Sequence, residues 1–365
     1  MASSSANRGV EVAAGLILLA AGVAALLWAN SPWAASYDAL RLPALHAIND
    51  GLMAIFFFFV GLEIKREILH GELSTARKGA LPVLAAAGGM IFPALIYAGL
   101  NSGGPGARGW GIPMATDIAF VLGVLNLLGS RVDPALKVFL TALAVADDMG
   151  AVTVIALFYT ANLSAAWLAC AAAPVALLFT LNRKGVERPW AYALAGTLLW
   201  YCVLKSGVHA TVAGAAAAFF VPAGLGARME AGLHPWVNLG IMPLFALANA
   251  GVALGSPGAL LASPVALGAS LGLIVGKLTG VFVVSAVSVA VGLAALPRGL
   301  TWNAMGGASL LAGIGFTMSL FVAGLSFQDP VLLGQAKAGI LAASAFCGLA
   351  GSYWLARAAP VAPSS

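Results

Sequence analysis

The sequence predicts an all-α polytopic membrane protein with about twelve transmembrane helices. Of its 365 residues, 61% are hydrophobic and only 8% are charged, and the mean hydropathy is +0.98. A soluble globular protein carries about 25% charged residues, so the composition excludes that class. The chain also divides into apolar stretches, most of them long enough to cross about 30 Å of hydrocarbon. Its 44 glycines favour close helix packing in lipid.

Twelve apolar segments account for nearly the whole chain. In order, they span residues 12–29, 49–64, 80–100, 111–129, 134–160, 165–181, 190–204, 207–222, 233–250, 265–292, 304–327 and 334–356. The polar start of the chain lacks the basic residues and the small-residue cleavage site of a signal peptide. The pieces between the segments are short, so residues 1–365 are predicted to form a single integral membrane unit.

The distribution of Lys and Arg predicts the orientation in the membrane. With the N-terminus in the cytoplasm, thirteen of the 18 basic residues fall in cytoplasmic loops and four fall outside, and Lys277 lies within a segment. The outside set is Arg41, Arg108, Lys205 and Lys337. This bias predicts an even number of crossings with both termini in the cytoplasm. The net charge of +5 therefore reflects topology, and no nucleic-acid partner is expected.

Three acids and one base lie within apolar segments. Asp147 and Asp148 are central in ALKVFLTALAVADDMGAVTVIALFYT, Asp117 lies in GIPMATDIAFVLGVL, and Lys277 lies in LGLIVGKLTGVFVV. Charged groups at membrane depth cost several kcal/mol and are rare unless they face a polar cavity with partners. A carboxylate can bind either a hard cation such as sodium or a proton, so one site can exchange the two by competition. Adjacent residues project about 100° apart on a helix, so Asp147 and Asp148 can have different roles.

Two segments are unusual for continuous helices. Segment 111–129 carries Pro113 just before Thr116 and Asp117, and segment 304–327 carries GIGFT from residue 313. They are the fourth and eleventh segments, each the middle of a triplet at segments 3–5 and 10–12. Interruptions at corresponding positions of two halves favour an inverted-repeat transporter. Broken helices bring half-helix ends to the midplane, where Asp117 is expected to neutralise N-termini and Lys277 to neutralise C-termini.

Several motifs resemble the NhaA-type sodium/proton antiporters of bacterial inner membranes. They are ATDIAFVLGVLNLLGSRV, ALAVADDMGAV, FFFFVGLEIKREI, LKSGVHATVAG, HPWVNLGIMPLFALANAG and GIGFTMSLFVAGLSF. The resemblance extends from about residue 12 to 356, and that family is a standard example of inverted-repeat transporters. It implies crossed, discontinuous fourth and eleventh helices in a multi-pass inner-membrane protein. It also implies electrogenic exchange of cytoplasmic sodium or lithium for external protons, activated at alkaline pH, with neither a cofactor nor enzymatic activity.

The resemblance assigns roles to particular residues. Asp148 resembles the principal sodium ligand, Asp147 resembles the acid that pairs with Lys277, and Thr116 and Asp117 match residues of the broken helix. Matches to residues linked with the pH response are Glu63, Arg66, Glu67, Glu230, His234 and His209. Ala231 stands where many relatives have a further histidine, which puts the pH profile in question.

The resemblance also predicts two groups of helices. Residues 80–183 and 265–357 are expected to form the ion-translocating core, and residues 10–70 and 205–250 an interface scaffold. A homodimer in the lipid bilayer is a further expectation. Relatives with a longer stretch between the first two helices form a β-hairpin that holds the dimer, and the short SPWAASYDALRLPALHAIND argues against that hairpin here.

Three other functional classes fit parts of the pattern. A sodium-coupled organic-solute symporter can share an inverted-repeat fold, but it needs a larger polar substrate pocket. An intramembrane aspartyl protease also uses two acids, for which Asp117 and Asp148 could serve, but the GxGD motif is absent and Lys277 would be superfluous. A cation channel would conduct without coupling to protons. Sodium-driven pH change in sealed vesicles separates these classes from an antiporter.

Overall fold

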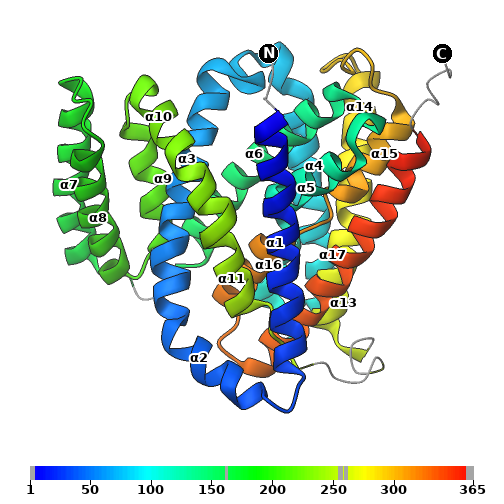
Figure 1. The fold of residues 1–365 in the computed structure, drawn as a ribbon, viewed down its shortest axis with the longest axis horizontal. Coiled ribbons are helices and arrows are strands. Elements are labelled where there is room, and N and C mark those ends of the chain that lie inside the picture. Colours follow the sequence, from blue (N-terminus) through cyan, green and yellow to red (C-terminus); the bar gives the residue numbers. More distant parts are fainter. Residues whose placement is uncertain (1–4, 161–162, 254–257, 259–261, 359–365) are drawn as a thin grey trace.

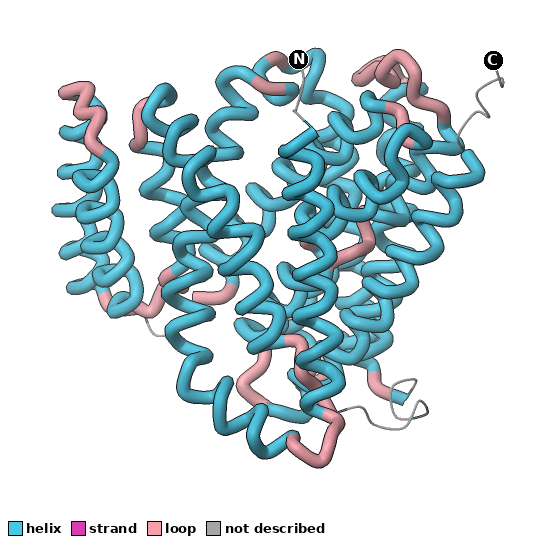
Figure 2. The backbone as a smooth tube through the Cα atoms, viewed as in Figure 1, coloured by secondary structure: helices cyan, strands magenta, loops and turns pink. Residues whose placement is uncertain are grey.

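The computed structural model describes residues 5–160, 163–253, 258 and 262–358. These described residues form an all-helical bundle without a strand (Figures 1 and 2). Both terminal stretches, residues 1–4 and 359–365, lie outside the described part.

The first half of the chain contains helices α1 to α8. Their bounds are α1 (Ser5–Ala29), α2 (Ala34–His46), η1 (Ala47–Leu52), α3 (Met53–His70), η2 (Glu72–Ser74), α4 (Ala76–Asn101), η3 (Ala107–Met114), α5 (Ile118–Leu128), η4 (Gly129–Arg131), α6 (Pro134–Phe158), α7 (Ala165–Arg183) and α8 (Pro189–Ser206).

The second half continues from α9 to α17. Its elements are α9 (Thr211–Phe220), α10 (Ala223–Trp236), η5 (Val237–Ile241), α11 (Met242–Asn249), α13 (Pro264–Leu271), η6 (Gly272–Gly276), α14 (Lys277–Ala290), α15 (Trp302–Leu311), α16 (Phe316–Ser326) and α17 (Pro330–Ala358). Three of the turns, η1, η5 and η6, are π-helical and lie inside longer helical segments.

The predicted class of polytopic membrane protein is confirmed. Nine helices among the described residues are long and apolar enough to cross a membrane, or ten if the bent pair α15 and α16 counts as one span. Two of the twelve predicted segments, 190–204 and 207–222, correspond to α8 with 18 residues and α9 with 10 residues, which are not among these spans. The count of twelve therefore stays a prediction.

The two ends of the described chain lie on the same side of the bundle. Helix α1 begins and α17 ends there, and the turns at residues 71–75, 184–188 and 291–301 lie at the same end (Figure 1). Six of the thirteen basic residues predicted to be cytoplasmic lie in or beside these turns: Arg77, Lys78, Arg183, Lys184, Arg188 and Arg298. The arrangement agrees with an even number of crossings, and the assignment of this side to the cytoplasm stays a prediction.

A helix occupies the stretch where a β-hairpin was considered. Helix α2 follows directly after the turn from α1, and no strand occurs in the described part of the chain. The Tyr37 hydroxyl of α2 donates a hydrogen bond to the Leu247 carbonyl at 2.7 Å, which fixes α2 against the end of α11. Helix α2 thus packs against another helix of the same chain.

Helices α4 and α14 approach closely through glycines. A Cβ atom on Gly88 would collide with the Gly280 carbonyl oxygen, and one on Gly280 would collide with the Gly88 carbonyl oxygen. Small residues at such a contact let two backbones pack directly in a membrane. The contact matters for the site because α14 begins at Lys277.

Replacing Gly88 by leucine is expected to destabilise the protein, because the added side chain must push α4 away from α14. Overpacking of this kind costs about 1–3 kcal/mol or more. Thermal unfolding of the purified protein measures the effect. Gly99→Leu in the same helix is the matched control, because a Cβ atom at Gly99 meets nothing within 4 Å. Equal melting temperatures for the two variants would show that α4 and α14 need no close contact here.

Candidate functional site

Two interrupted segments bind each other through their breaks. In one, η3 is followed by extended residues 115–117 and then by α5, and in the other α15 and α16 are bent by 44° at residues 312–315. The Asp117 amide donates to the Ile314 carbonyl at 2.7 Å, and the Thr116 hydroxyl donates to the Ala312 carbonyl at 2.8 Å. Each break leaves main-chain groups without helical hydrogen-bond partners, and the other break supplies partners for some of them. Buried polar groups require such partners.

Asp117 caps two helices at once. Its Oδ1 accepts the Phe120 amide at 3.0 Å in the first turn of α5. Its Oδ2 accepts the Thr317 amide at 3.1 Å and also the Thr317 hydroxyl, both in the first turn of α16. A carboxylate is favourable at a helix N-terminus, where unpaired amides and the helix dipole are positive. The residue is 1% exposed, so its charge is balanced by these two N-termini rather than by water.

Asp147 and Lys277 form a fully buried ion pair. The Lys277 Nζ lies 2.6 Å from Asp147 Oδ2, and both side chains are 0% exposed. Among the described residues, Asp147 is the hydrogen-bond partner of this ammonium, and no hydrogen bond joins it to the C-terminal carbonyls of η3 or α15. Thr116 lies close to the same carboxylate, whose Oδ1 makes no hydrogen bond of good geometry.

A π-helical turn places Lys277. Residues Gly272–Gly276 form η6, and their two outer glycines pack against prolines of other segments, Gly272 on Pro113 and Gly276 on Pro93. A side chain at either glycine would collide with these prolines. The extra residue in a π-turn rotates the helix that follows, and such turns are frequent at functional sites. Here the turn ends at the residue that carries the ammonium.

Asp148, like Asp147, keeps an oxygen without a hydrogen-bond partner, but it has no ion-pair partner. It is 3% exposed, and its Oδ1 has no hydrogen-bond partner. The charged groups that act on it are Asp147, Glu63, Asp117 and Lys277, so acids predominate around it. Within the described residues, no three His, Cys, Asp or Glu side chains cluster as metal ligands. A hard cation held here would thus need hydroxyl, carbonyl or water oxygens besides the carboxylates, which suits a cargo ion that must leave again.

A second charged cluster lies at the end of α3 towards residues 71–75. The Arg66 guanidinium lies 3.0 Å from Glu230 of α10, 3.0 Å from Glu67 and 3.8 Å from Glu63. One cation therefore joins three acids and ties α3 to α10. His234 lies beside this cluster, in edge contact with Phe59.

A small cavity connects this cluster with the broken segments. Its volume is about 60 Å³, and its lining comprises Ala14, Phe59, Glu63, Ile118, Ala119, Leu122, His234 and Asn238. Ile118 and Ala119 are the first residues of α5, directly after Asp117. The cavity therefore lies between Glu63 and His234 on one side and the first turn of α5 on the other.

His209 lies apart from this cluster. Its Nδ1 lies 2.9 Å from the Thr211 hydroxyl, and its Nε2 lies 3.6 Å from Asp50. Its ring stands edge-on to Phe321 of α16. The structure thus separates His209 from the other five residues matched to the pH response.

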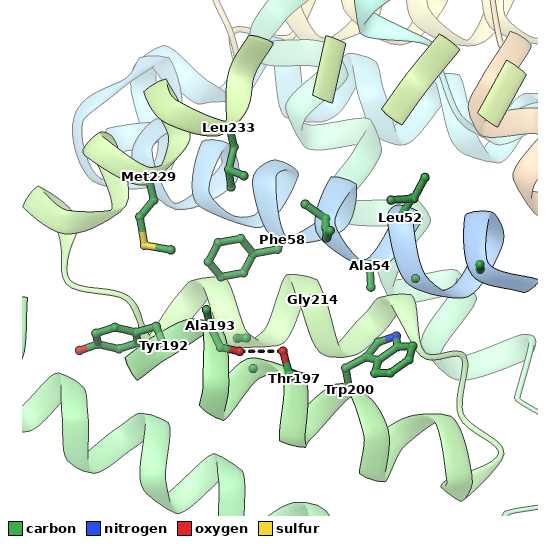
Figure 3. Close-up of a pocket in the computed structure, with 15 residues that line it drawn as sticks. Leu52, Ala54, Phe58, Tyr192, Ala193, Thr197, Trp200, Gly214, Met229 and Leu233 are labelled. Atoms are coloured by element: carbon green, nitrogen blue, oxygen red, sulfur yellow. Dashed lines mark hydrogen bonds between the residues drawn. The ribbon is translucent and has the colours of Figure 1, made fainter. Parts of the chain in front are cut away.

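A large apolar groove lies apart from the candidate ion site. It has a volume of about 530 Å³ and lies between α3, α8, α9 and α10 (Figure 3). Phe58, Tyr192, Trp200 and Met229 line it, and its lining includes no Asp, Glu, Lys or Arg. A groove of this chemistry cannot stabilise a sodium ion.

Comparison with protein families shows which family the chain belongs to. The model of the family described as Na+/H+ antiporter 1 matches residues 8–355. The chain belongs to this sodium/proton antiporter family. It is similar to a Na(+)/H(+) antiporter NhaA of Rhodospirillum rubrum, with 51% identity over 94% of each chain. It is also similar to a Na(+)/H(+) antiporter NhaA 2 of Klebsiella pneumoniae subsp. pneumoniae, with 53% identity over 90% of this chain and 88% of the relative.

A third relative is the Na(+)/H(+) antiporter NhaA of Koribacter versatilis, at 45% identity over 95% of this chain and 90% of the relative. The resemblance inferred from the motifs is therefore confirmed. These relatives are transporters by name, which is consistent with the expectation of a non-enzyme.

In this antiporter, the structure brings the predicted site residues together from distant segments. Thr116, Asp117, Asp147, Asp148 and Lys277 gather where the two breaks meet α6 and α14. The partners that the sequence did not predict are Thr317, which donates to Asp117, and the main-chain carbonyls of Ala312 and Ile314. No side-chain pattern reveals the carbonyls.

Proposed function

We propose that this antiporter moves sodium, or lithium, out of the cytoplasm in exchange for external protons, with Asp148 as the shared binding group. One observation carries the proposal: Asp148 is buried among acids and keeps an oxygen without a partner, beside the ion pair of Asp147 and Lys277. A protonated Asp148 has no net charge to desolvate, and a sodium ion replaces that proton by neutralising the carboxylate. The two ions therefore exclude each other from one group.

The ion pair supplies a second proton to the cycle. Sodium bound between Asp148 and Asp147 adds positive charge beside Lys277 and weakens the attraction of Asp147 for the ammonium. An ammonium without its partner at this depth is costly, so Lys277 releases its proton when sodium binds. The site then releases two protons for each sodium ion that it binds, so the exchange moves net charge. This supports an electrogenic antiporter.

The charge of Asp117 lowers the electrostatic cost of a cation near the broken segments. Asp117 balances the N-termini of α5 and α16, which would otherwise repel a cation. We expect residues 80–183 and 265–357 to form the ion-translocating core, because all these groups lie within them. We expect residues 10–70 and 205–250 to form the scaffold, in a homodimer within a bacterial inner membrane, with both termini cytoplasmic.

The Arg66 cluster is proposed to regulate exchange by pH. Three acids compete for one guanidinium, so removing or adding a proton at Glu63, Glu67 or Glu230 changes the contact between α3 and α10. The cavity beside it is lined by Glu63 and by the first residues of α5. Alkaline pH is expected to activate exchange through this contact.

Sodium-driven pH change in sealed vesicles tests the function. Purified protein in vesicles loaded with a pH-sensitive dye is given an outward sodium gradient, and the lumen is expected to acidify as protons enter in exchange. Empty vesicles are the control. Because two protons leave the site when one sodium ion binds, the apparent sodium affinity is expected to fall by up to about a hundredfold per pH unit at acidic pH.

Three outcomes would contradict this proposal. A sodium flux without any change in luminal pH would indicate a channel. A sodium flux that requires an organic solute would indicate a sodium-coupled symporter, which neither the family model nor the relatives support. A sodium affinity that stays constant over the whole pH range would require a separate proton path.

A further inference from the structure

A second polar pocket lies at the opposite end of the bundle from the Arg66 cluster. It has a volume of about 550 Å³ and lies between α2, residues 251–253 and the first turns of α17. Both α2 and the start of α17 lie at the end away from the start of α1 (Figure 1). Charged residues line it from two helices, Asp38 and Arg41 from α2 and Lys337 from α17. None of these residues belongs to the exchange site.

Lys337 is buried without a partner. It is only 6% exposed, and the described residues supply neither a hydrogen bond nor an ion pair to its ammonium. Its charged neighbours are Arg41 and Asp38. Asp38 is already paired with Arg41, because its Oδ1 lies 2.7 Å from both Nε and Nη2 of that residue. Residues 254–261, which follow the pocket lining in sequence, contain no acid that could supply a carboxylate.

The pocket thus holds two cations and one acid. The Lys337 side chain is buried, but its unpaired ammonium faces the pocket. Such a group within a membrane protein normally has a functional partner. The donors that remain are Lys337 Nζ, the unused face of the Arg41 guanidinium and the amide group of Gln335, whose Oε1 already accepts from the Ser263 hydroxyl at 2.7 Å. Arg and Lys donors that converge from two elements match an oxyanion.

We propose that this pocket binds a compact oxyanion, chemically a phosphate group, between Lys337 of α17 and Arg41 of α2. The group comes either from free phosphate in the external medium or from the headgroup of an anionic lipid. The volume accommodates such an anion with its remaining water. A bound anion would hold α2 and α17 together. Because α2 belongs to the predicted scaffold and α17 to the predicted core, the anion would stabilise the contact between these two parts.

Thermal unfolding of the full-length protein in phospholipid-free detergent tests this site. Potassium phosphate is compared with potassium chloride at equal ionic strength, and dihexanoyl phosphatidylglycerol with dihexanoyl phosphatidylcholine. The melting temperature of the unmodified protein is expected to rise saturably with phosphate, with phosphatidylglycerol, or with both. In Lys337→Gln, half-saturation is expected to need at least about tenfold more ligand, because a charge-assisted hydrogen bond is lost.

The controls separate this site from general electrostatics. Lys205→Gln removes an exposed lysine from the last turn of α8, one of the four basic residues predicted to lie outside, and should respond as the unmodified protein does. Arg41→Gln removes the second donor and decides the question if Lys337→Gln does not fold. Stabilisation by inorganic phosphate assigns the site to a free oxyanion, and stabilisation by phosphatidylglycerol alone assigns it to a lipid. The proposal is wrong if neither ligand stabilises the protein, or if both variants respond unchanged.

Discussion

Replacing Asp148 by asparagine is expected to abolish sodium binding and sodium/proton exchange while leaving the fold intact. Asparagine has the same shape but cannot carry the negative charge that neutralises a sodium ion or bind the exchanged proton. The carboxylate oxygen Oδ1 has no hydrogen-bond partner, so little structure depends on it. We expect the sodium affinity to fall at least about a hundredfold, which corresponds to about 2.8 kcal/mol.

Isothermal titration of the purified protein with sodium measures this loss, and vesicle assays measure exchange. Asp133→Asn is the matched control. Asp133 is exposed, lies just before the same helix α6, and accepts a hydrogen bond from the Ala135 amide at 2.7 Å, which an asparagine also accepts. An undiminished sodium affinity in Asp148→Asn would remove Asp148 from the site.

Replacing Lys277 by glutamine is expected to reduce the charge moved per turnover while some exchange persists. Asp148 still competes for sodium and protons, but the second proton of each cycle is gone. The variant should also be less stable, because breaking a buried pair costs about 3–5 kcal/mol while the remaining partner stays charged. Asp147 is that partner, at 0% exposure.

Transport by reconstituted Lys277→Gln protein under an imposed membrane voltage tests this role. Moving one elementary charge is worth about 2.3 kcal/mol per 100 mV, so an electrogenic exchanger shifts its sodium gradient with voltage and an electroneutral one does not. Lys205→Gln serves as the exposed-lysine control. Adding Asp147→Asn to Lys277→Gln should restore much of the lost stability, since no unpaired charge is then left. If voltage dependence is undiminished, Lys277 carries no transported proton and serves only to hold the helices together.

The sequence by itself determined the class of protein and most of the helical segments, and it singled out the residues proposed for the exchange site. Lipid imposes a local rule, about twenty apolar residues for each span, and a local rule can be read from short windows. An acid or a lysine inside such a window is conspicuous because it is costly, which is why Asp117, Asp147, Asp148 and Lys277 stood out. Proline and glycine beside Thr116 and Phe316 likewise indicated the breaks.

The resemblance implied the pair of Asp147 and Lys277, but only the tertiary structure decided the other pairings. Asp117 and Thr317 are 200 residues apart, and Arg66 and Glu230 are 164 apart. The partners of Thr116 and of the Asp117 amide are main-chain carbonyls, which every residue possesses and no pattern distinguishes.

The burial of Lys337 likewise could not be predicted from the sequence. Its sequence position near the start of an apolar segment suggested a basic residue of an external loop, yet it is buried without a partner, because α2 and residues 251–253 pack around it. Burial depends on which segments meet in space. Composition along one segment does not contain that information.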